Sequence, residues 1–115
     1  MEISCQTEDG IVHHQIISTV EQMSEFINLY FCSDYYLQIQ SVTYHLLKTA
    51  RCALRDYPKI ILHIQGRILP QELLITYLDD FHYFLSQHPS QQYLLEINSI
   101  VFKMQKLGTI NNANE

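Results

Sequence analysis

Tryptophan is absent from this sequence of 115 residues, and glycine, proline and cysteine each occur only three times. The three isolated glycines, Gly10, Gly66 and Gly108, exclude a glycine-rich phosphate-binding loop of the usual kinds. Scarce glycine and proline beside 47% hydrophobic residues are typical of a globular chain rather than a disordered one. The length fits one domain, so we expect a single globular domain over residues 1–110 and a frayed tail over 111–115.

Long hydrophobic runs and paired cysteines are also missing. No apolar stretch approaches the roughly 18–20 residues that a membrane-spanning helix needs, and the acidic N-terminal residues do not resemble a secretory leader. The cysteines, Cys5, Cys32 and Cys52, are odd in number, widely spaced and outside any C-x-x-C motif, so we expect three reduced thiols. These features predict a cytoplasmic protein that does not associate with membranes.

Positive charge is missing from the first 47 residues, which contain six carboxylates and no Lys or Arg. All seven Lys and Arg residues follow, and the net charge of the whole chain is −5. An acidic chain repels phosphate backbones, which argues against general nucleic-acid binding. The uneven distribution allows the two parts of the chain to face different protein partners.

The start of the chain predicts a hairpin followed by a helix. Asp9-Gly10 lies between short runs that contain Ile and Val, and this turn needs residues that tolerate positive φ, so residues 2–17 predict a β-hairpin. Ser18-Thr-Val-Glu21 matches a capping box, in which the first and last side chains satisfy free amides. Apolar residues at helical spacing then predict a helix over 19–31.

The middle of the chain predicts a second helix and a buried strand. Residues 33–42 alternate in a way that slightly favours a strand over the first turns of a helix. Residues 43–57 carry a helical stripe that Pro58 would end. The run Lys59–Gln65 is short, β-branched and almost continuously apolar, as expected for a strand covered on both faces.

Pro70 suits the first turn of another helix, whose buried stripe we expect to consist of Leu74, Leu78, Phe81 and Leu85. Residues 91–98 form either a strand before a short helix from Ser99 or part of one longer helix, and Gly108 would cap either helix. A weak echo of Leu-x-Ile near residues 37, 62 and 95 favours the strands. The predicted fold class is therefore α/β, a small mixed β-sheet with an N-terminal hairpin and three to four helices packed on it. The alternative is a mostly α protein with a small sheet.

Metal-binding and catalytic motifs are not evident. No two of the six histidines lie at the spacing that aims two ligands at one ion, and adjacent His13 and His14 would point to opposite faces of a strand. Asp79 and His82 can touch on a helix as an acid–base pair, but no nucleophile completes a site. Cys52 lies beside Arg51, whose charge favours a thiolate, yet the adjoining apolar stripe favours an inert thiol. We expect no catalytic residue, no metal, no cofactor and, on balance, no enzymatic activity.

Basic and aromatic residues supply the candidate binding features. On a helix over 43–57, three- and four-residue spacing would line up four side chains along one face: His45, Lys48, Arg51 and Arg55. This basic ridge would bind an acidic partner or the acidic half of a second copy; the alternative is an ordinary solvated face. Aromatic side chains crowd the preceding segment, which we expect to supply both core and contact surface: Tyr30, Phe31, Tyr35, Tyr36 and Tyr44.

The expected order of hairpin, helix, strand, helix and strand resembles the small STAS-type fold of anti-sigma-factor antagonists. The supporting runs are Glu8-Asp-Gly-Ile-Val, Lys59-Ile-Ile-Leu-His-Ile-Gln-Gly and the repeated cycle from His88-Pro89 through Tyr93-Leu-Leu-Glu-Ile. The resemblance implies a regulatory α/β domain. Regulatory members of that family carry a phosphorylatable Ser or Thr in a turn after a central strand. The turn here, Gly66-Arg-Ile-Leu-Pro70, has no hydroxyl, so no phosphorylation switch is implied.

The sequence thus predicts a non-enzymatic protein-binding or regulatory domain that acts through the basic ridge and a tyrosine-rich surface. Its partner would be another protein, a second copy of the chain in a homodimer, or both. One alternative is a small enzyme or ligand-binding domain, which a pocket joining Asp79 and His82 to other polar groups would support. A further alternative is a phage or effector protein that inhibits a host factor.

Overall fold

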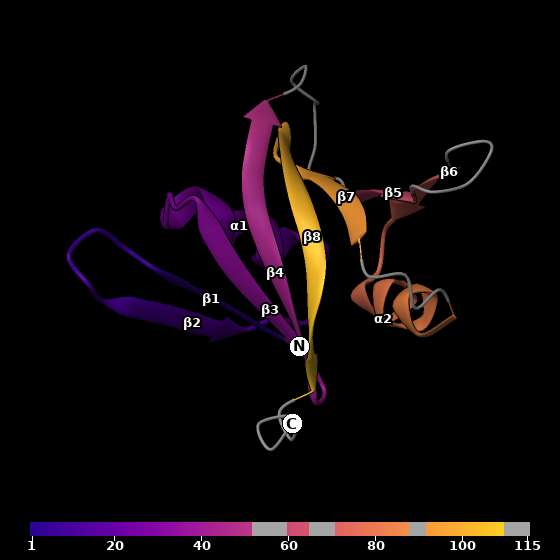
Figure 1. Ribbon diagram of the computed structural model, residues 1–115, viewed down its shortest axis with the longest axis horizontal. Helices are drawn as coiled ribbons and strands as arrows, with labels where there is room; N and C mark the ends of the chain where they lie inside the picture. The colour runs from indigo at the N-terminus through magenta and orange to yellow at the C-terminus, as the bar shows by residue number, and fades with distance from the viewer. Residues whose placement is uncertain (52–59, 65–70, 88–91, 110–115) are drawn as a thin grey trace.

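The computed structural model describes residues 1–51, 60–64, 71–87 and 92–109 (Figure 1). Within these ranges the chain forms eight strands and two helices. Their order is β1 (Glu2–Gln6), β2 (Val12–Ile16), α1 (Val20–Leu29), β3 (Asp34–Ile39), β4 (Val42–Arg51), β5 (Ile60–Ile64), β6 (Gln71–Ile75), α2 (Leu78–Gln87), β7 (Gln92–Ile97) and β8 (Ile100–Thr109). The protein is mostly β, so the expected mixed sheet with three to four helices is wrong, and so is the mostly α alternative.

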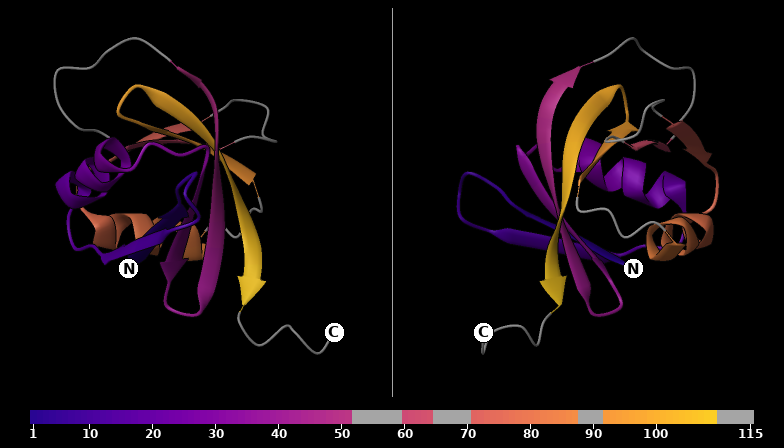
Figure 2. Two further views of the ribbon diagram at one scale, coloured as in Figure 1. Left: turned by 90° about the vertical axis from the view of Figure 1, so that its left-hand side faces the viewer. Right: turned by 45° about the vertical axis from the view of Figure 1, so that its right-hand side comes forward.

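All eight strands form one antiparallel sheet in the order β2-β1-β3-β4-β8-β7-β5-β6. Both helices lie on the same side of this sheet, where the strands curve around them (Figure 2). The core fills the space between, with inward side chains that alternate along each strand. Its most buried members include Leu37, Leu46, Leu95 and Phe102 from the sheet and Met23, Phe26 and Phe81 from the helices. We call the other side, which carries no helix within the described ranges, the open face.

The two halves of the chain are structural repeats of a ββαββ unit. Every element of the second half begins 58 residues after its counterpart, except β6, which begins 59 residues after β2. The halves meet at β4 and β8, where Leu46 pairs with Met104, its own counterpart in the repeat. Of the three sequence echoes, those at Leu37-Gln-Ile-Gln-Ser and Leu95-Glu-Ile-Asn-Ser are equivalent positions, whereas Leu62 lies on β5, the counterpart of β1.

Several local predictions are confirmed. β1 and β2 pair as a hairpin in which Gly10 has a φ of +84° at the turn. The first helix is capped by a Thr19–Gln22 capping box, one residue later than the predicted Ser18–Glu21 pair. Strands are present at β3, β5 and β7, as the favoured interpretations expected.

The predicted helix over 43–57 is wrong where the structure describes it, because Val42–Arg51 is strand β4. Its neighbours on both sides supply the reason: β3 pairs with residues 42–47, and β8 pairs with β4 from Val42 to Arg51. Buried Tyr44 and Leu46 alternate with His45 and Leu47, which is the period of a strand. The end of that helix, residues 52–57, lies outside the described residues.

The helix predicted to start at Pro70 is wrong in its first part. Pro70 lies outside the described residues, and Gln71–Ile75 is the edge strand β6. Leu74, assigned to the buried stripe, is 54% exposed on that strand, whereas Leu78, Phe81 and Leu85 are buried on α2 as expected. Strand β6, which pairs with β5 in the second half, therefore takes up residues that the helical spacing predicted to be the start of a longer helix.

The C-terminal helix is also wrong, because residues 100–109 form strand β8. Leu94, Ile97, Val101 and Met104 have the spacing of one face of a longer helix, but in the strands they lie on two faces. Ile97 and Met104 are buried, while Leu94 and Val101 are half-buried. A two-residue turn at Asn98 and Ser99, with φ of 55° and 61°, joins β7 directly to β8. Gly108 pairs with Thr43 inside the sheet and caps no helix. Residues 110–115, with the expected tail, lie outside the described residues.

Candidate functional site

The two members of the basic ridge whose side chains the structure describes, His45 and Lys48, do not share one face. Because β4 is a strand, residues three apart point to opposite sides of the sheet. His45 lies on the open face, paired with Tyr36. Lys48 pairs with buried Phe102, and its Nζ lies 3.5 Å from the centroid of the Phe31 ring. The side chain of Arg51 and the whole of Arg55 lie outside what the structure describes.

His45 and Asp34 form the centre of a polar cluster on the open face. The Nε2 atom of His45 lies 2.7 Å from Oδ1 of Asp34, which comes from the neighbouring strand β3. The imidazole also stacks on Tyr36, with 5.2 Å between the ring centroids. Of the aromatic residues crowded into 30–44, Phe31 and Tyr36 are exposed, Tyr30 is half-buried, and Tyr35 and Tyr44 belong to the core.

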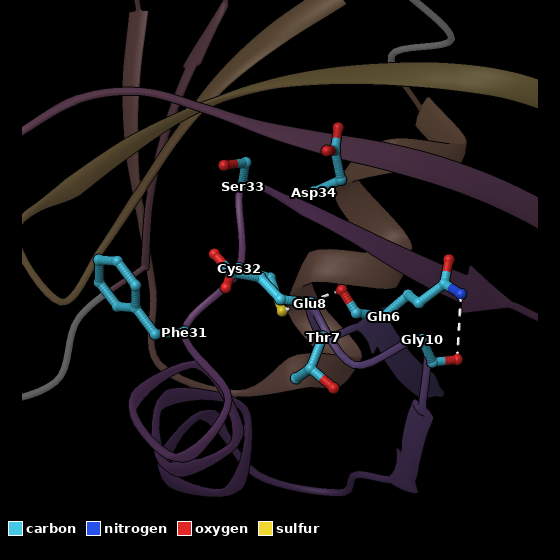
Figure 3. A pocket seen from close by; sticks show the side chains of 8 residues that line it. All are labelled: Gln6, Thr7, Glu8, Gly10, Phe31, Cys32, Ser33 and Asp34. Carbon is cyan, nitrogen blue, oxygen red and sulfur yellow. Dashed lines mark hydrogen bonds between the residues drawn. The ribbon is translucent and has the colours of Figure 1, made fainter.

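A hollow of about 510 Å³ adjoins this cluster at the end of the β1–β2 hairpin (Figure 3). Its walls come from two segments, the hairpin turn and the connection from α1 to β3, and consist of Gln6, Thr7, Glu8, Gly10, Phe31, Cys32, Ser33 and Asp34. Two of these residues, Glu8 and Asp34, carry carboxylates. We call this hollow the acidic hollow. Asp34 belongs to it and to the His45 cluster, so the two features form one continuous surface.

The hairpin turn is held by its own hydrogen bonds. Gly10 donates its backbone N–H to the carbonyl of Thr7 at 2.9 Å, and Gln6 donates through Nε2 to the Gly10 carbonyl at 3.1 Å. The Asp9 carboxylate accepts from the Thr7 hydroxyl and from the amide of Ile11, and these bonds lower the pKa of Asp9. The wall of the acidic hollow is therefore a preformed turn that leaves Glu8 exposed.

A hydroxyl–histidine contact lies beside this turn, but it does not make a nucleophile. Thr7 Oγ1 lies 3.3 Å from Nε2 of His13, whose ring stacks on Tyr30 with 4.0 Å between centroids. The single hydroxyl proton of Thr7 is donated to the Asp9 carboxylate, the stronger acceptor. His13 therefore donates to Thr7 rather than abstracting its proton, and the stacking of its ring on Tyr30 anchors the hairpin to the end of α1.

The two described cysteines are buried neighbours. Cys32 donates through Sγ to the carbonyl of Gln6 at 3.4 Å, which places it at the inner wall of the acidic hollow. Burial, followed by contact with the Cys32 thiol, raises the pKa of Cys5 to about 12. Cys5 is therefore an inert thiol at neutral pH. Cys52, the thiol considered from the sequence, lies outside the described residues.

A second hollow, of about 430 Å³, brings Asp79 and His82 together with residues from the first half of the chain. Its lining includes Ser18, Ile39 and Gln40. An adjoining hollow of about 210 Å³ shares Ile39, Gln40 and His82. Between the described side chains, the two histidine–carboxylate ion pairs are those of Glu2 with His14 and Asp34 with His45, so Asp79 and His82 face a common space without bonding each other.

Sequence reasoning found Asp79, His82 and His45 but missed the acidic hollow. Glu8 and Asp34 lie 26 residues apart in the chain, and only the pairing of β1 with β3 brings them to one site. No group of three or more possible metal ligands occurs within the described ranges. Neither helix there is long and apolar enough to cross a membrane.

Comparison of the chain with protein-family models, with curated proteins and with solved structures gives no match. The resemblance to STAS-type domains therefore stays a prediction, and the functional argument depends on the geometry of this chain alone.

Proposed function

We propose that this chain is a non-enzymatic protein-binding domain that holds its partner at the acidic hollow and the adjoining open face of β3 and β4. The observation that carries this proposal is the continuity of the surface through Asp34, which lines the hollow and bonds His45. Exposed apolar side chains border it, namely Phe31 at 64%, Tyr36 at 41% and Leu47 at 37% exposure. Aromatic anchors beside a polar rim are the composition of protein interfaces.

The chemistry of the surface fits a basic partner rather than the acidic partner expected from the ridge. Glu8 and Asp34 line the hollow, and no Lys or Arg occurs in the first 47 residues. Lys48 lies over the Phe31 ring. A Lys or Arg side chain flanked by apolar residues would place its charge between the carboxylates and its neighbours against Phe31 and Leu47.

The test compares two double variants of equal charge change. E8K/D34K reverses the hollow, while E21K/E25K reverses two exposed carboxylates on α1. The probes are short peptides that alternate Lys or Arg with Leu, and matched peptides with Glu in the basic positions, followed by fluorescence anisotropy. We expect the basic peptides to bind the wild type and E21K/E25K, with affinity for E8K/D34K reduced by about tenfold or more. Equal binding to both variants would show that the hollow is not the contact.

Affinity capture from the producing cell then identifies the natural partner. Proteins retained by the wild type and by E21K/E25K, but lost with E8K/D34K, are the expected result. The same variants keep their thermal transition if the loss is one of contact rather than of folding, since Glu8 and Asp34 are both exposed.

A ligand-binding role is the second candidate, and the hollow at Asp79 and His82 favours it. Ser18, Gln40, Asp79 and His82 offer hydroxyl, amide, carboxylate and imidazole groups around one space of about 430 Å³, a size suited to a small molecule. Ligand-observed NMR with a panel of small amines and amides tests this role, with His82→Ala as the matched variant. Binding by the wild type that is lost in the variant supports a ligand site, and absence of any binder argues against it.

A further inference from the structure

β2 is an edge strand whose outer side is free of protein contacts within the described ranges. It pairs with β1 alone, and the sheet ends there. Ile16 is 75% exposed and Val12 is 60% exposed, both on the open face. Figure 1 shows the β1–β2 hairpin projecting away from the central strands. Such an edge is a template for pairing with another strand.

The usual protections against edge pairing are absent from this strand. β2 has the sequence Val-His-His-Gln-Ile, which contains no Lys, Pro or carboxylate. Its register with β1 is regular from Val12 to Ile16, so no bulge twists the edge away. An unprotected edge with two exposed apolar side chains indicates that this strand is covered in the working protein.

The hydrogen bonds to β1 fix which groups of β2 face the free edge. Residues of an antiparallel strand alternate between those whose N–H and C=O both point to one neighbour and those that point to the other. Ile17 donates its N–H to the Met1 carbonyl at 2.9 Å, and the Ile11 carbonyl accepts from Thr7 at 3.0 Å. The odd-numbered residues therefore bond β1, and the N–H and C=O groups of Val12, His14 and Ile16 point outward.

We propose that β2 pairs with β2 of a second copy of this chain, antiparallel about a two-fold axis at His14. In this register Val12 lies opposite Ile16 of the second copy, Ile16 lies opposite Val12, and the two His14 residues face each other. Every outward N–H and C=O group of the three residues then has a partner. If the register of the two β2 strands shifts by one residue, the outward N–H and C=O groups of one strand face residues of the other whose groups already bond β1. If the register shifts by two residues, one of the three outward residues at the end of each strand has no partner.

The occupant is a second copy because the edge complements itself. A two-fold interface brings one patch against the same patch, so its bonding groups and side chains must match under reversal. Val12, His14 and Ile16 do so: apolar residues flank a central histidine at equal distances. Each His14 also lies 3.1 Å from the Glu2 carboxylate of its own β1, so its ring is held in place near the axis.

The dimer and the partner-binding role are independent. The acidic hollow uses the hairpin turn and residues 31–34, whereas the pairing uses the edge of β2. Reversal of charge at Glu8 and Asp34 is therefore expected to leave the oligomeric state unchanged. A pairing of five residues per strand is small, so the dissociation constant is expected to be on the order of micromolar.

Charge substitutions at the two edge positions test the register. V12K/I16K places lysines opposite lysines across the axis, and V12E/I16E does the same with carboxylates. We expect the wild type to be a dimer by size-exclusion light scattering across the micromolar range. Each variant alone should have its dissociation constant raised by about tenfold or more, because like charges directly opposite are destabilising. An equimolar mixture of the two should regain the dimer, since every lysine then faces a carboxylate.

Leu29→Lys and Tyr83→Lys are the matched controls, because both replace exposed apolar residues on the helices, at 70% and 68% exposure. They are expected to remain dimeric. A wild type that is monomeric at every concentration overturns the proposal. So does a dimer that V12K/I16K leaves intact, or one that the mixture does not restore. Circular dichroism shows whether each variant is folded, and because the substituted side chains are exposed, all of them are expected to keep the wild-type spectrum.

Discussion

Asn98 donates through Nδ2 to the backbone carbonyl of Ser24 at 3.0 Å, although the two residues lie 74 positions apart. The contact joins the β7–β8 turn of the second half to α1 of the first, and the Ser24 hydroxyl adds a bond to Oδ1 of Asn98. Asn28 contributes a longer contact at 3.3 Å. The counterparts of Asn98, Ser24 and Asn28 in the other half are Gln40, His82 and Ser86, and these line a hollow instead.

Asn98→Gly should therefore destabilise the protein, by ~1–3 kcal/mol in the free energy of unfolding, because it removes these bonds while tolerating the φ of 55°. The matched variant is Gln40→Gly, at the equivalent turn with a φ of 56°. Since the Gln40 side chain makes no bond to α2 in the described structure, that variant should be neutral or stabilised by up to ~1 kcal/mol. Urea denaturation measures both, and equal losses would contradict the asymmetry of the two turns.

Tyr35→Phe should cost ~1–3 kcal/mol, because its hydroxyl accepts from the amide of Cys32 at 3.0 Å and donates to the Tyr30 carbonyl at 2.6 Å. Removing the hydroxyl leaves both backbone groups unpaired in the core. Tyr36→Phe is the control, since Tyr36 is on the open face, and it should change stability by less than ~0.5 kcal/mol. A thermal transition of Tyr35→Phe equal to that of the control would show that the connection from α1 to β3 does not need this hydroxyl.

Thiol labelling should be slow at Cys5 in the folded protein. Burial and the neighbouring Cys32 raise its pKa to about 12, so the reactive thiolate is scarce at pH 8. With Cys52 replaced by Ser, iodoacetamide should modify the native protein far more slowly than the protein in urea. Mass spectrometry of the labelled peptides assigns the site. Labelling of native Cys5 at the rate of a free thiol would contradict its burial.

Stability should fall at alkaline pH. Burial raises the pKa of Tyr35 and Tyr44 above 10.0 and raises that of Cys5 from 9.0 to about 12. In each case the folded state holds its proton more tightly than the unfolded state, so the stabilisation is complete below pH 9 and decreases as the pH rises from there towards 12. Absorbance at 295 nm should show Tyr35 and Tyr44 titrating above the range of a free tyrosine. Tyr44→Phe should flatten the decline, and an unchanged pH dependence would argue against this cause.

The local features of the fold were predictable where a turn, a helix cap or an alternation of apolar and polar residues is visible in the sequence itself. The Asp9-Gly10 turn predicts the β1–β2 hairpin, and the capping residues before Val20 predict α1. The alternation of Leu37 and Ile39 with polar residues predicts β3.

β4 was not predictable because an exposed Leu47 follows buried Leu46 and Lys48 lies on the inward side, so polar and apolar residues do not alternate. In β8, half-buried Val101 breaks the alternation and completes a helical spacing. The echo of Leu-x-Ile was a weak signal of the repeat. It predicted strands but no repeat, because Leu62, on β5, is not equivalent to Leu37 and Leu95.

The candidate site was less predictable than the fold. The three-residue spacing of His45 and Lys48 would place both on one face of a helix. Because the segment is a strand, they lie on opposite faces of the sheet. The acidic hollow depends on β1 lying next to β3, which no local pattern encodes. The absence of Lys and Arg from residues 1–47 was the one sequence signal for it.

Leu46 faces Met104 at the centre of the sheet, so the two halves of the layer are related by an approximate two-fold axis. Because one chain supplies both halves, equivalent positions need not carry the same residue. One junction between a turn and a helix is closed by an asparagine, while the other is open beside a histidine. A near-symmetric architecture within one chain thus differs between its halves at the positions that decide whether a junction closes.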